Sequence, residues 1–284
     1  MNKIELNSVS KINIGLNILN RRDDGYHNLQ TIFYPLLLAD KIIFEKSDKT
    51  TFNSDSPELN NLKSNLVVDA KNLLEELVKS KLNVRIYIEK KIPIGGGLGG
   101  GSSDAASTLN ALNTLFNLKL TYKKLLSLAI QLGSDIPFFL NPVPCLATSR
   151  GELMKQVQLS ISYPILIINP GIHISTKWAF QQLKNKSSVN DLNKISSKSL
   201  ITLDDVKKYA TNDFEDIVFK HFPLLKEIKE KLYLFGAEFA LMTGTGSTVY
   251  GIFTNLQKAG LAKEDFETKY FTFLNYPLDK GSIT

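Results

Sequence analysis

The chain has 284 residues, a length that suits one large domain or two ordinary ones. Hydrophobic residues make up 43% of it and charged residues 22%, which excludes a disordered or fibrous protein and indicates a folded core. No apolar stretch approaches the length of a membrane span, so we expect no membrane partner. Residues 1–10 lack the basic patch and apolar run of a secretory signal.

The charge balance and the cysteine and histidine content limit the partners further. Thirty-four basic against 28 acidic residues give a net charge of +6, which suits either nucleic acid or a polyanionic small molecule. The lysines are dispersed and form no basic arm, so a solvated surface explains most of them and no nucleic-acid partner is expected. A lone cysteine, Cys145, favours the reducing cytoplasm. Three scattered histidines offer no zinc-site spacing, so no protein metal site is predicted.

The first half of the chain shows four periodic segments. Residues 11–19 and 41–46 have the apolar runs or alternation of strands. Residues 65–77 have helical apolar spacing, and residues 83–92 alternate like a half-buried strand.

A second group of elements follows. Residues 102–118 place alanines, leucines and a phenylalanine on one helical face, and residues 121–132 predict another helix with Thr121 as its N-cap. Further strands are predicted at residues 165–168 and 248–253.

The order of these elements predicts an α+β fold, because strands and helices mix without a regular βαβ repeat. The sequence pattern changes after the prolines at 142 and 144, so we predict two lobes, residues 1–155 and 156–284. The polar segment 184–199 is expected to form a loop or short helices.

The segment with the strongest chemical meaning links the strand at 83–92 to the helix at 102–118. It consists of Pro93, Ile94, Gly95, Gly96, Gly97, Leu98, Gly99, Gly100, Gly101, Ser102 and Ser103. Glycines let the backbone approach a ligand closely, and the unpaired amides at a helix N-terminus favour an anion, most often a phosphate. A flexible linker is the alternative, but linkers are seldom bracketed by an apolar strand and an alanine-rich helix.

Two other phosphate-binding loops do not fit this segment. It lacks the Gly-Lys-Ser/Thr ending of a Walker A loop. Its glycines satisfy GxGxxG, but a dinucleotide fold needs an acidic residue about 20 positions later, and residues 105–134 contain none. Ser102 or Ser103 could bind a phosphate-bound Mg²⁺, or could cap the helix.

Other candidate residues each have two interpretations. Lys11 enters an apolar strand, either as an exposed edge lysine or as a fixed charge near a reacting oxygen. Asp135 precedes Ile-Pro-Phe-Phe, so partial desolvation suits a general base, although a helix cap is equally consistent. Tyr26 and His27 lie in a predicted hairpin turn, where they could bind a flat ring or be incidental. Residues 243–248 form a second glycine-rich turn.

These segments together resemble the GHMP kinase superfamily of galacto-, homoserine, mevalonate and phosphomevalonate kinases. The lysine strand, the loop 93–103 and the turn 243–248 occur in the order of its three motifs. The stretches 11–33, 133–139 and 242–247 are similar to the branch that acts on cytidine diphosphate-linked methylerythritol in the non-mevalonate isoprenoid route. The turn carries Thr243 and Thr245 where serines are usual in the family.

The resemblance implies a two-lobed fold, with an N-terminal ATP-binding lobe like domain 2 of ribosomal protein S5 and a ferredoxin-like C-terminal lobe. It implies ATP with Mg²⁺ as cofactors, with the loop 93–103 around the phosphates. It implies that Asp135 accepts the proton of the substrate's C2 hydroxyl, while Lys11 aligns this hydroxyl with the γ-phosphate. Such a site needs mainly positioning and charge neutralisation.

The resemblance also implies a substrate site. Tyr26 and Phe180 sandwich the cytosine, His27 reads its hydrogen-bonding edge, and Asn13 and Thr176 make polar contacts to the substrate.

Alternative interpretations remain open at this stage. A homoserine or mevalonate type of kinase would not need the turn at residues 25–27. An RNA-binding module would use the basic charge and the ribosomal-protein-like lobe, although the lysines are not clustered. We expect a cytoplasmic protein that is a monomer or a weak homodimer.

Overall fold

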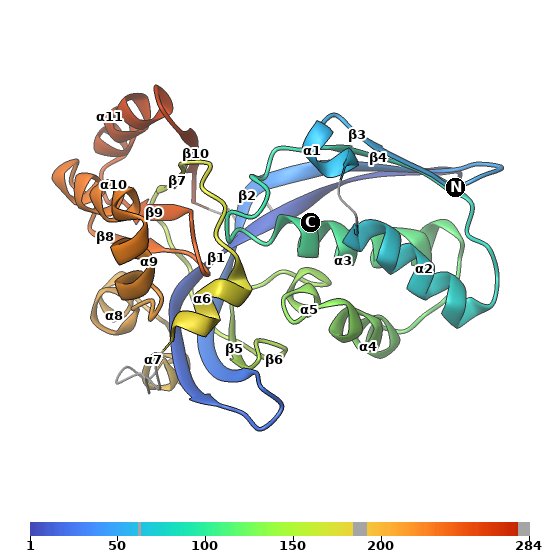
Figure 1. Ribbon diagram of the computed structural model, residues 1–284, viewed down its shortest axis with the longest axis horizontal. Helices are drawn as coiled ribbons and strands as arrows, with labels where there is room; N and C mark the ends of the chain where they lie inside the picture. Colours follow the sequence, from blue (N-terminus) through green and yellow to red (C-terminus); the bar gives the residue numbers. More distant parts are fainter. Residues whose placement is uncertain (62–63, 184–191, 278–284) are drawn as a thin grey trace. The chain divides into compact units, whose positions relative to one another are not determined.

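The computed structural model describes residues 1–61, 64–183 and 192–277 (Figure 1). These residues form two compact units. The first unit contains Met1–Ser10, Leu38–Ile94 and Gly99–Pro142. The second contains Lys11–Leu37, Gly95–Leu98 and the described residues from Val143 onward.

Two long strands contribute residues to both units. β1 (Lys3–Arg21) and β2 (His27–Lys46) extend well beyond the segments predicted at 11–19 and 41–46. Both faces of β1 are buried over much of its length, where Lys11 and Asn13 are as buried as Ile12 and Ile14. Polar side chains at buried positions hide the alternation on which the sequence prediction relied.

The first unit combines a small sheet with helices. β4 (Val84–Glu89) pairs antiparallel with the end of β2 and parallel with β3 (Thr51–Ser54). Its inward residues alternate with exposed ones, as predicted. The helices are α1 (Pro57–Asn60), α2 (Leu66–Val78), α3 (Gly100–Leu115), α4 (Tyr122–Leu132) and α5 (Ile136–Phe139).

Helix ends in this unit follow capping chemistry. The side chain of Thr121 accepts a hydrogen bond from the Lys124 amide, which confirms the predicted N-cap of α4. α3 begins two residues before the predicted start and ends at Leu115 instead of residue 118. It stops there because Asn117 adopts a left-handed conformation with φ of 52°, which asparagine tolerates better than most residues.

The second unit contains a second sheet. Its strand order is β10 (Phe271–Asn275), β7 (Ile165–Asn169), β9 (Val249–Ile252) and β8 (Phe239–Met242), and neighbouring strands are antiparallel. This is the order of the split βαβ, ferredoxin-like arrangement. In the same unit, β5 (Cys145–Ser149) pairs with the beginning of β2 and with β6 (Leu153–Gln156).

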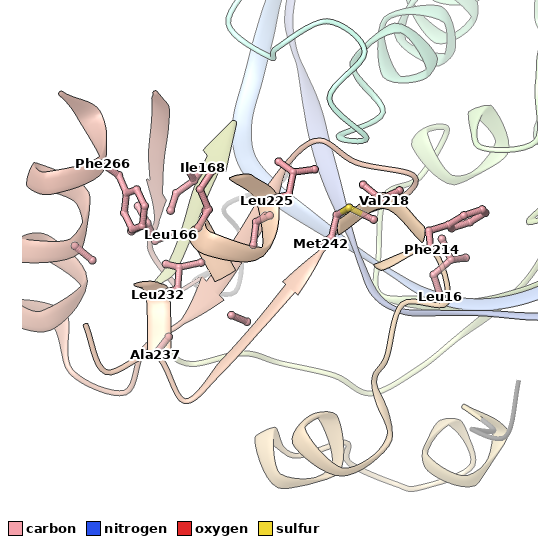
Figure 2. Packing of buried hydrophobic residues seen from close by; sticks show 14 of the residues in the cluster. Leu16, Leu166, Ile168, Phe214, Val218, Leu225, Leu232, Ala237, Met242 and Phe266 are labelled. Carbon is pink, nitrogen blue, oxygen red and sulfur yellow. The ribbon is translucent and has the colours of Figure 1, made fainter. Parts of the chain in front are cut away.

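The helices of the second unit cover its core. They are α6 (Thr176–Gln182), α7 (Asn193–Ser196), α8 (Leu203–Tyr209), α9 (Glu215–His221), α10 (Pro223–Leu234) and α11 (Leu256–Glu267). α10 packs on β8 and β9, and α11 packs on β7 and β10. Figure 2 shows part of this core, including Leu166 and Ile168 from β7, Leu225 from α10 and Phe266 from α11.

The predicted α+β class is confirmed by this mixture of antiparallel sheets and helices. The polar segment 184–199 was predicted to form a loop or short helices. Residues 184–191 lie outside the described residues, and α7 is a short helix in the rest of the segment. In the described ranges, no helix has both the length and the apolar character that a membrane crossing requires.

Candidate functional site

The stretch Gly95–Leu98 of the glycine-rich loop belongs to the second unit and is fixed there by backbone hydrogen bonds. The amide of Lys11 on β1 donates to the Leu98 carbonyl over 2.9 Å, and the Thr248 amide donates to the Gly96 carbonyl over 3.3 Å. Gly97 has φ of +78°, and a Cβ there would lie 2.5 Å from the Thr243 carbonyl oxygen. Glycine is therefore required where this loop meets the turn 243–248.

The second half of the loop opens helix α3 in the first unit. Gly99 occupies the N-cap with φ of 75°, and having no side chain, it cannot cap the first amides. Ser103 is buried and accepts a hydrogen bond from Ser8 over 2.8 Å, whereas Ser102 is half-buried. The amides at the start of this 16-residue helix have the polarity that attracts an anion.

A buried ionic cluster supports both stems of the loop within the first unit. The Lys90 ammonium contacts the carboxylates of Asp40 and, over 3.0 Å, Asp104, the fifth residue of α3. Asp40 also accepts hydrogen bonds from the amides of Lys91 and Ile92, directly before the loop. The cluster thus ties the chain before the loop to the helix after it.

Burial and ion pairing act in opposite directions on the charged groups of this cluster. Burial raises the pKa of Asp104 to about 7, although Lys90 acts in the opposite direction. Burial alone would lower the pKa of Lys90, but the two carboxylates raise it above its ordinary value. The Asp104 carboxyl therefore holds a proton more readily near neutral pH than an ordinary aspartate does.

Lys11 lies inside the second unit. Only 3% of its surface is exposed, so it is not an edge lysine. Its ammonium donates to the Asn13 side-chain oxygen over 2.7 Å and to the Gly97 carbonyl over 3.1 Å. The strand lysine and the glycine-rich loop, predicted separately, are thus in direct contact.

Asp135 lies in the first unit at the N-cap position of α5, after α4. It is half-buried, and α5 packs on α3. Asp135 occupies the cap position, but its side chain makes no capping hydrogen bond to α5, and the general-base interpretation stays a prediction.

The predicted hairpin turn between β1 and β2 is present. The Arg22 amide donates to the Tyr26 carbonyl over 2.8 Å, and the Tyr26 amide donates to the Asp24 carboxylate over 3.1 Å. The Tyr26 side chain is 58% exposed, and the Arg150 guanidinium lies 5.0 Å from the centre of its ring.

His27 and Phe180 lie ring against ring. Their centroids are 5.2 Å apart with an interplanar angle of 29°. Phe180 also packs edge-on against the buried Phe214. Burial and, secondarily, the charge of Arg21 lower the pKa of His27, so the imidazole is neutral at pH 7.

Thr176 begins α6, and its hydroxyl lies 3.3 Å from that of Thr245 in the glycine turn. Asn13, predicted as a substrate contact, makes its side-chain hydrogen bonds to protein groups: Lys11, Thr243 and Thr31. The network around Thr31 and the cluster around Lys90 carried no functional prediction from sequence, because neither has a local spacing signal.

Comparisons with known proteins agree over nearly the whole chain. The family models described as GHMP kinases N terminal domain and GHMP kinases C terminal match residues 65–141 and 197–272. The chain belongs to the GHMP kinase family. As a member, it is an ATP-dependent small-molecule kinase.

Several similar full-length proteins share one name. The 4-diphosphocytidyl-2-C-methyl-D-erythritol kinase of Bacteroides fragilis is 40% identical over 92% of this chain and 95% of its own. The kinase of that name from Thermodesulfovibrio yellowstonii is 38% identical over 91% and 92%. A crystal structure of 4-(cytidine 5'-diphospho)-2C-methyl-D-erythritol kinase is 30% identical, with a TM-score of 0.81 over 96% of this chain and 98% of that one. Homoserine kinase from Cytophaga hutchinsonii, 15% identical with a TM-score of 0.69 over 98% and 95%, shares the fold.

Proposed function

We propose that this chain transfers the γ-phosphate of ATP to the C2 hydroxyl of 4-diphosphocytidyl-2-C-methyl-D-erythritol, in the non-mevalonate route to isoprenoid precursors. The observation that carries the proposal is the near full-length similarity, at 36–40% identity, to kinases named for that substrate. Homoserine kinase shares only the fold at 15% identity and supports no substrate assignment.

The substrate residues give physical support to a cytidine ligand. His27 and Phe180 meet in the second unit beside the turn that carries Tyr26. In the proposed complex, Tyr26 and Phe180 stack on the cytosine and neutral His27 hydrogen-bonds its edge, while Thr176 contacts the substrate. A site built for a polar base edge discriminates strongly against ligands that lack it.

The nucleotide is assigned to the loop 93–103. Its amides and those at the start of α3 bind the phosphates of ATP. Mg²⁺ bound to ATP would neutralise phosphate charge, and since this ion prefers oxygen ligands, a serine hydroxyl of the loop could hold it. Ser102 fits this contact better than Ser103, since the Ser103 hydroxyl is buried against Ser8.

Lys11 and Asp135 are assigned the catalytic roles. Asp135 accepts the proton of the attacking hydroxyl, and the ammonium of Lys11 holds that oxygen and the γ-phosphate in line. Phosphoryl transfer requires little else from the protein. We place the reaction in the cytoplasm and expect a monomer or a weak homodimer.

The test is turnover of ATP with three alcohols: the cytidylyl substrate, mevalonate and homoserine. We expect ADP release with the first alone. Comparable rates with mevalonate or homoserine, or none with the cytidylyl alcohol, would reject the substrate assignment. Asp135→Ala should bind ATP normally in calorimetry yet show no turnover, and a near-normal rate would remove Asp135 from the base role.

A further inference from the structure

Lys11 is held by a chain of hydrogen bonds that ends at a threonine outside the predicted site. Its ammonium donates to Oδ1 of Asn13 over 2.7 Å, and Nδ2 of Asn13 donates to Oγ1 of Thr31 over 2.8 Å. Thr31 in turn donates to the Gly15 carbonyl over 2.6 Å. Lys11, Asn13 and Thr31 are each at most 3% exposed, so water does not compete for these bonds.

The direction of this chain follows from proton counting. A threonine hydroxyl has one proton, and that of Thr31 is used on the Gly15 carbonyl. Toward Asn13, Thr31 can therefore only accept, so it must face the amide nitrogen. The other amide atom of Asn13, Oδ1, therefore faces Lys11 and accepts a hydrogen bond from its ammonium.

The hydroxyl of Thr243, in the glycine turn, is compatible with the same orientation. Its oxygen accepts from the Asn13 backbone amide over 2.9 Å, and its proton reaches either Oδ1 of Asn13 over 3.1 Å or the Gly97 carbonyl over 3.4 Å. A flipped amide would place N–H groups against the Lys11 ammonium and leave the Thr243 proton only the longer bond to Gly97. Thr31 therefore fixes Oδ1 as the acceptor for Lys11, and Thr243 is a second donor to the same atom.

The series of hydrogen bonds ends at the carbonyl of Gly15, where the backbone conformation favours glycine. Gly15 has φ of +76° within β1, and a Cβ there would lie 3.1 Å from the Leu192 side chain and 3.3 Å from the Cα of Ala210. A side chain is therefore disfavoured at the residue whose carbonyl receives the Thr31 proton.

We propose that Thr31, with Thr243, is a positioning residue for phosphoryl transfer: by fixing the amide of Asn13 it holds the Lys11 ammonium in its working position. This inference rests on the proposed role of Lys11. It gives Asn13 a role in supporting Lys11, beside the proposed polar contact of Asn13 to the substrate. Thr31 touches neither substrate nor ATP in this account.

The test compares Thr31→Val, which removes the hydroxyl and keeps the branched shape, with Thr31→Ser, which keeps the hydroxyl. We expect Thr31→Val to lower kcat about 10- to 100-fold, the scale of a slightly misplaced catalytic group. KM for ATP and for the cytidylyl alcohol should change less than about twofold, because ground-state binding is retained. Thr31→Ser should restore most of kcat.

Two further variants separate positioning from general destabilisation. Thr108→Val removes another fully buried threonine hydroxyl, which donates to the Asp104 carbonyl in α3, and its kcat should be unchanged. In an Asn13→Ala background, Thr31→Val should have little additional effect, because the group through which it acts is gone. Thermal unfolding of each variant is measured beside kcat, and each should be folded at the assay temperature.

The outcomes are distinct. A normal kcat for Thr31→Val beside an inactive Lys11→Met would overturn the positioning role, as would effects of Asn13→Ala and Thr31→Val that simply multiply. A normal kcat for Lys11→Met would instead refute the proposed role of Lys11. If Thr31→Val does not fold, Thr243→Val against Thr243→Ser tests the same acceptor.

Discussion

Replacing Lys90 by methionine should destabilise the fold more than any surface substitution. The side chains of Lys90, Asp40 and Asp104 are 7%, 0% and 2% exposed, so Lys90→Met leaves two carboxylates buried without their shared cation. Removing one partner of a buried ion pair costs about 3–5 kcal/mol. Asp40 keeps its two backbone donors, which places our expectation at the lower end of that range.

The pH dependence of this loss has a definite sign. The folded-state pKa of Asp104 is raised from 3.8 to about 7, so between these values the folded state binds a proton that the unfolded chain releases. The stability contributed by Asp104 is therefore fully present below the unfolded pKa and is lost as pH rises through the folded one. A protonated Asp104 needs no cation, so the Lys90→Met loss should be smaller at pH 5 than at pH 8.

Urea unfolding at these two pH values measures the effect. Lys91→Met is the matched control, because Lys91 is the next residue and pairs with Glu89 while 56% exposed, where an ion pair contributes about 1 kcal/mol or less. Equal losses in the two variants would contradict the reasoning. So would a Lys90→Met loss that is the same at pH 5 and pH 8.

Three more predictions concern the loop and the substrate site. Asp104→Asn should remove part of the fall in unfolding free energy between pH 4 and pH 7, and parallel wild-type and variant curves would refute the raised pKa. Gly97→Ala should raise KM for ATP at least about tenfold or prevent folding, because its Cβ would clash with backbone. Gly171→Ala, at φ of +74° with open space around it, is its control, and similar effects would exclude the clash. KM for the cytidylyl alcohol, but not for ATP, should rise as pH falls through the lowered pKa of His27; a flat profile would remove His27 from base recognition.

The sequence pattern predicted correctly those elements that neighbouring residues alone determine. The alternation at β4 was predicted correctly because one face of this strand is buried and the other is exposed. The cap at Thr121 was predicted correctly because it depends on a single hydroxyl next to the helix. β1 and β2 were predicted too short, since burial on both faces removes the period of two. The first glycines of α3 were assigned to the loop, because glycine has low helix propensity and the tertiary structure overrides it.

The candidate site was only partly predictable, for a different reason. The glycine-rich loop could be predicted as a phosphate site because its glycines and the helix after it are visible in the sequence. Thr31 and Thr243, by contrast, lie 18 and 230 positions from Asn13, and only the fold brings their hydroxyls to its amide. Lys90 and Asp104 flank the loop in sequence, but nothing local indicates that both are buried.

The central claim is that this chain places a phosphoryl group on the alcohol of a cytidine-diphosphate ester. Phosphorus-31 NMR of a reaction with ATP, Mg²⁺ and the cytidylyl alcohol tests it most directly. We predict a new phosphomonoester signal on the methylerythritol carbon skeleton, with the diphosphate bridge intact and one ADP formed per ester. ADP without that signal, or cleavage of the diphosphate, would contradict the account.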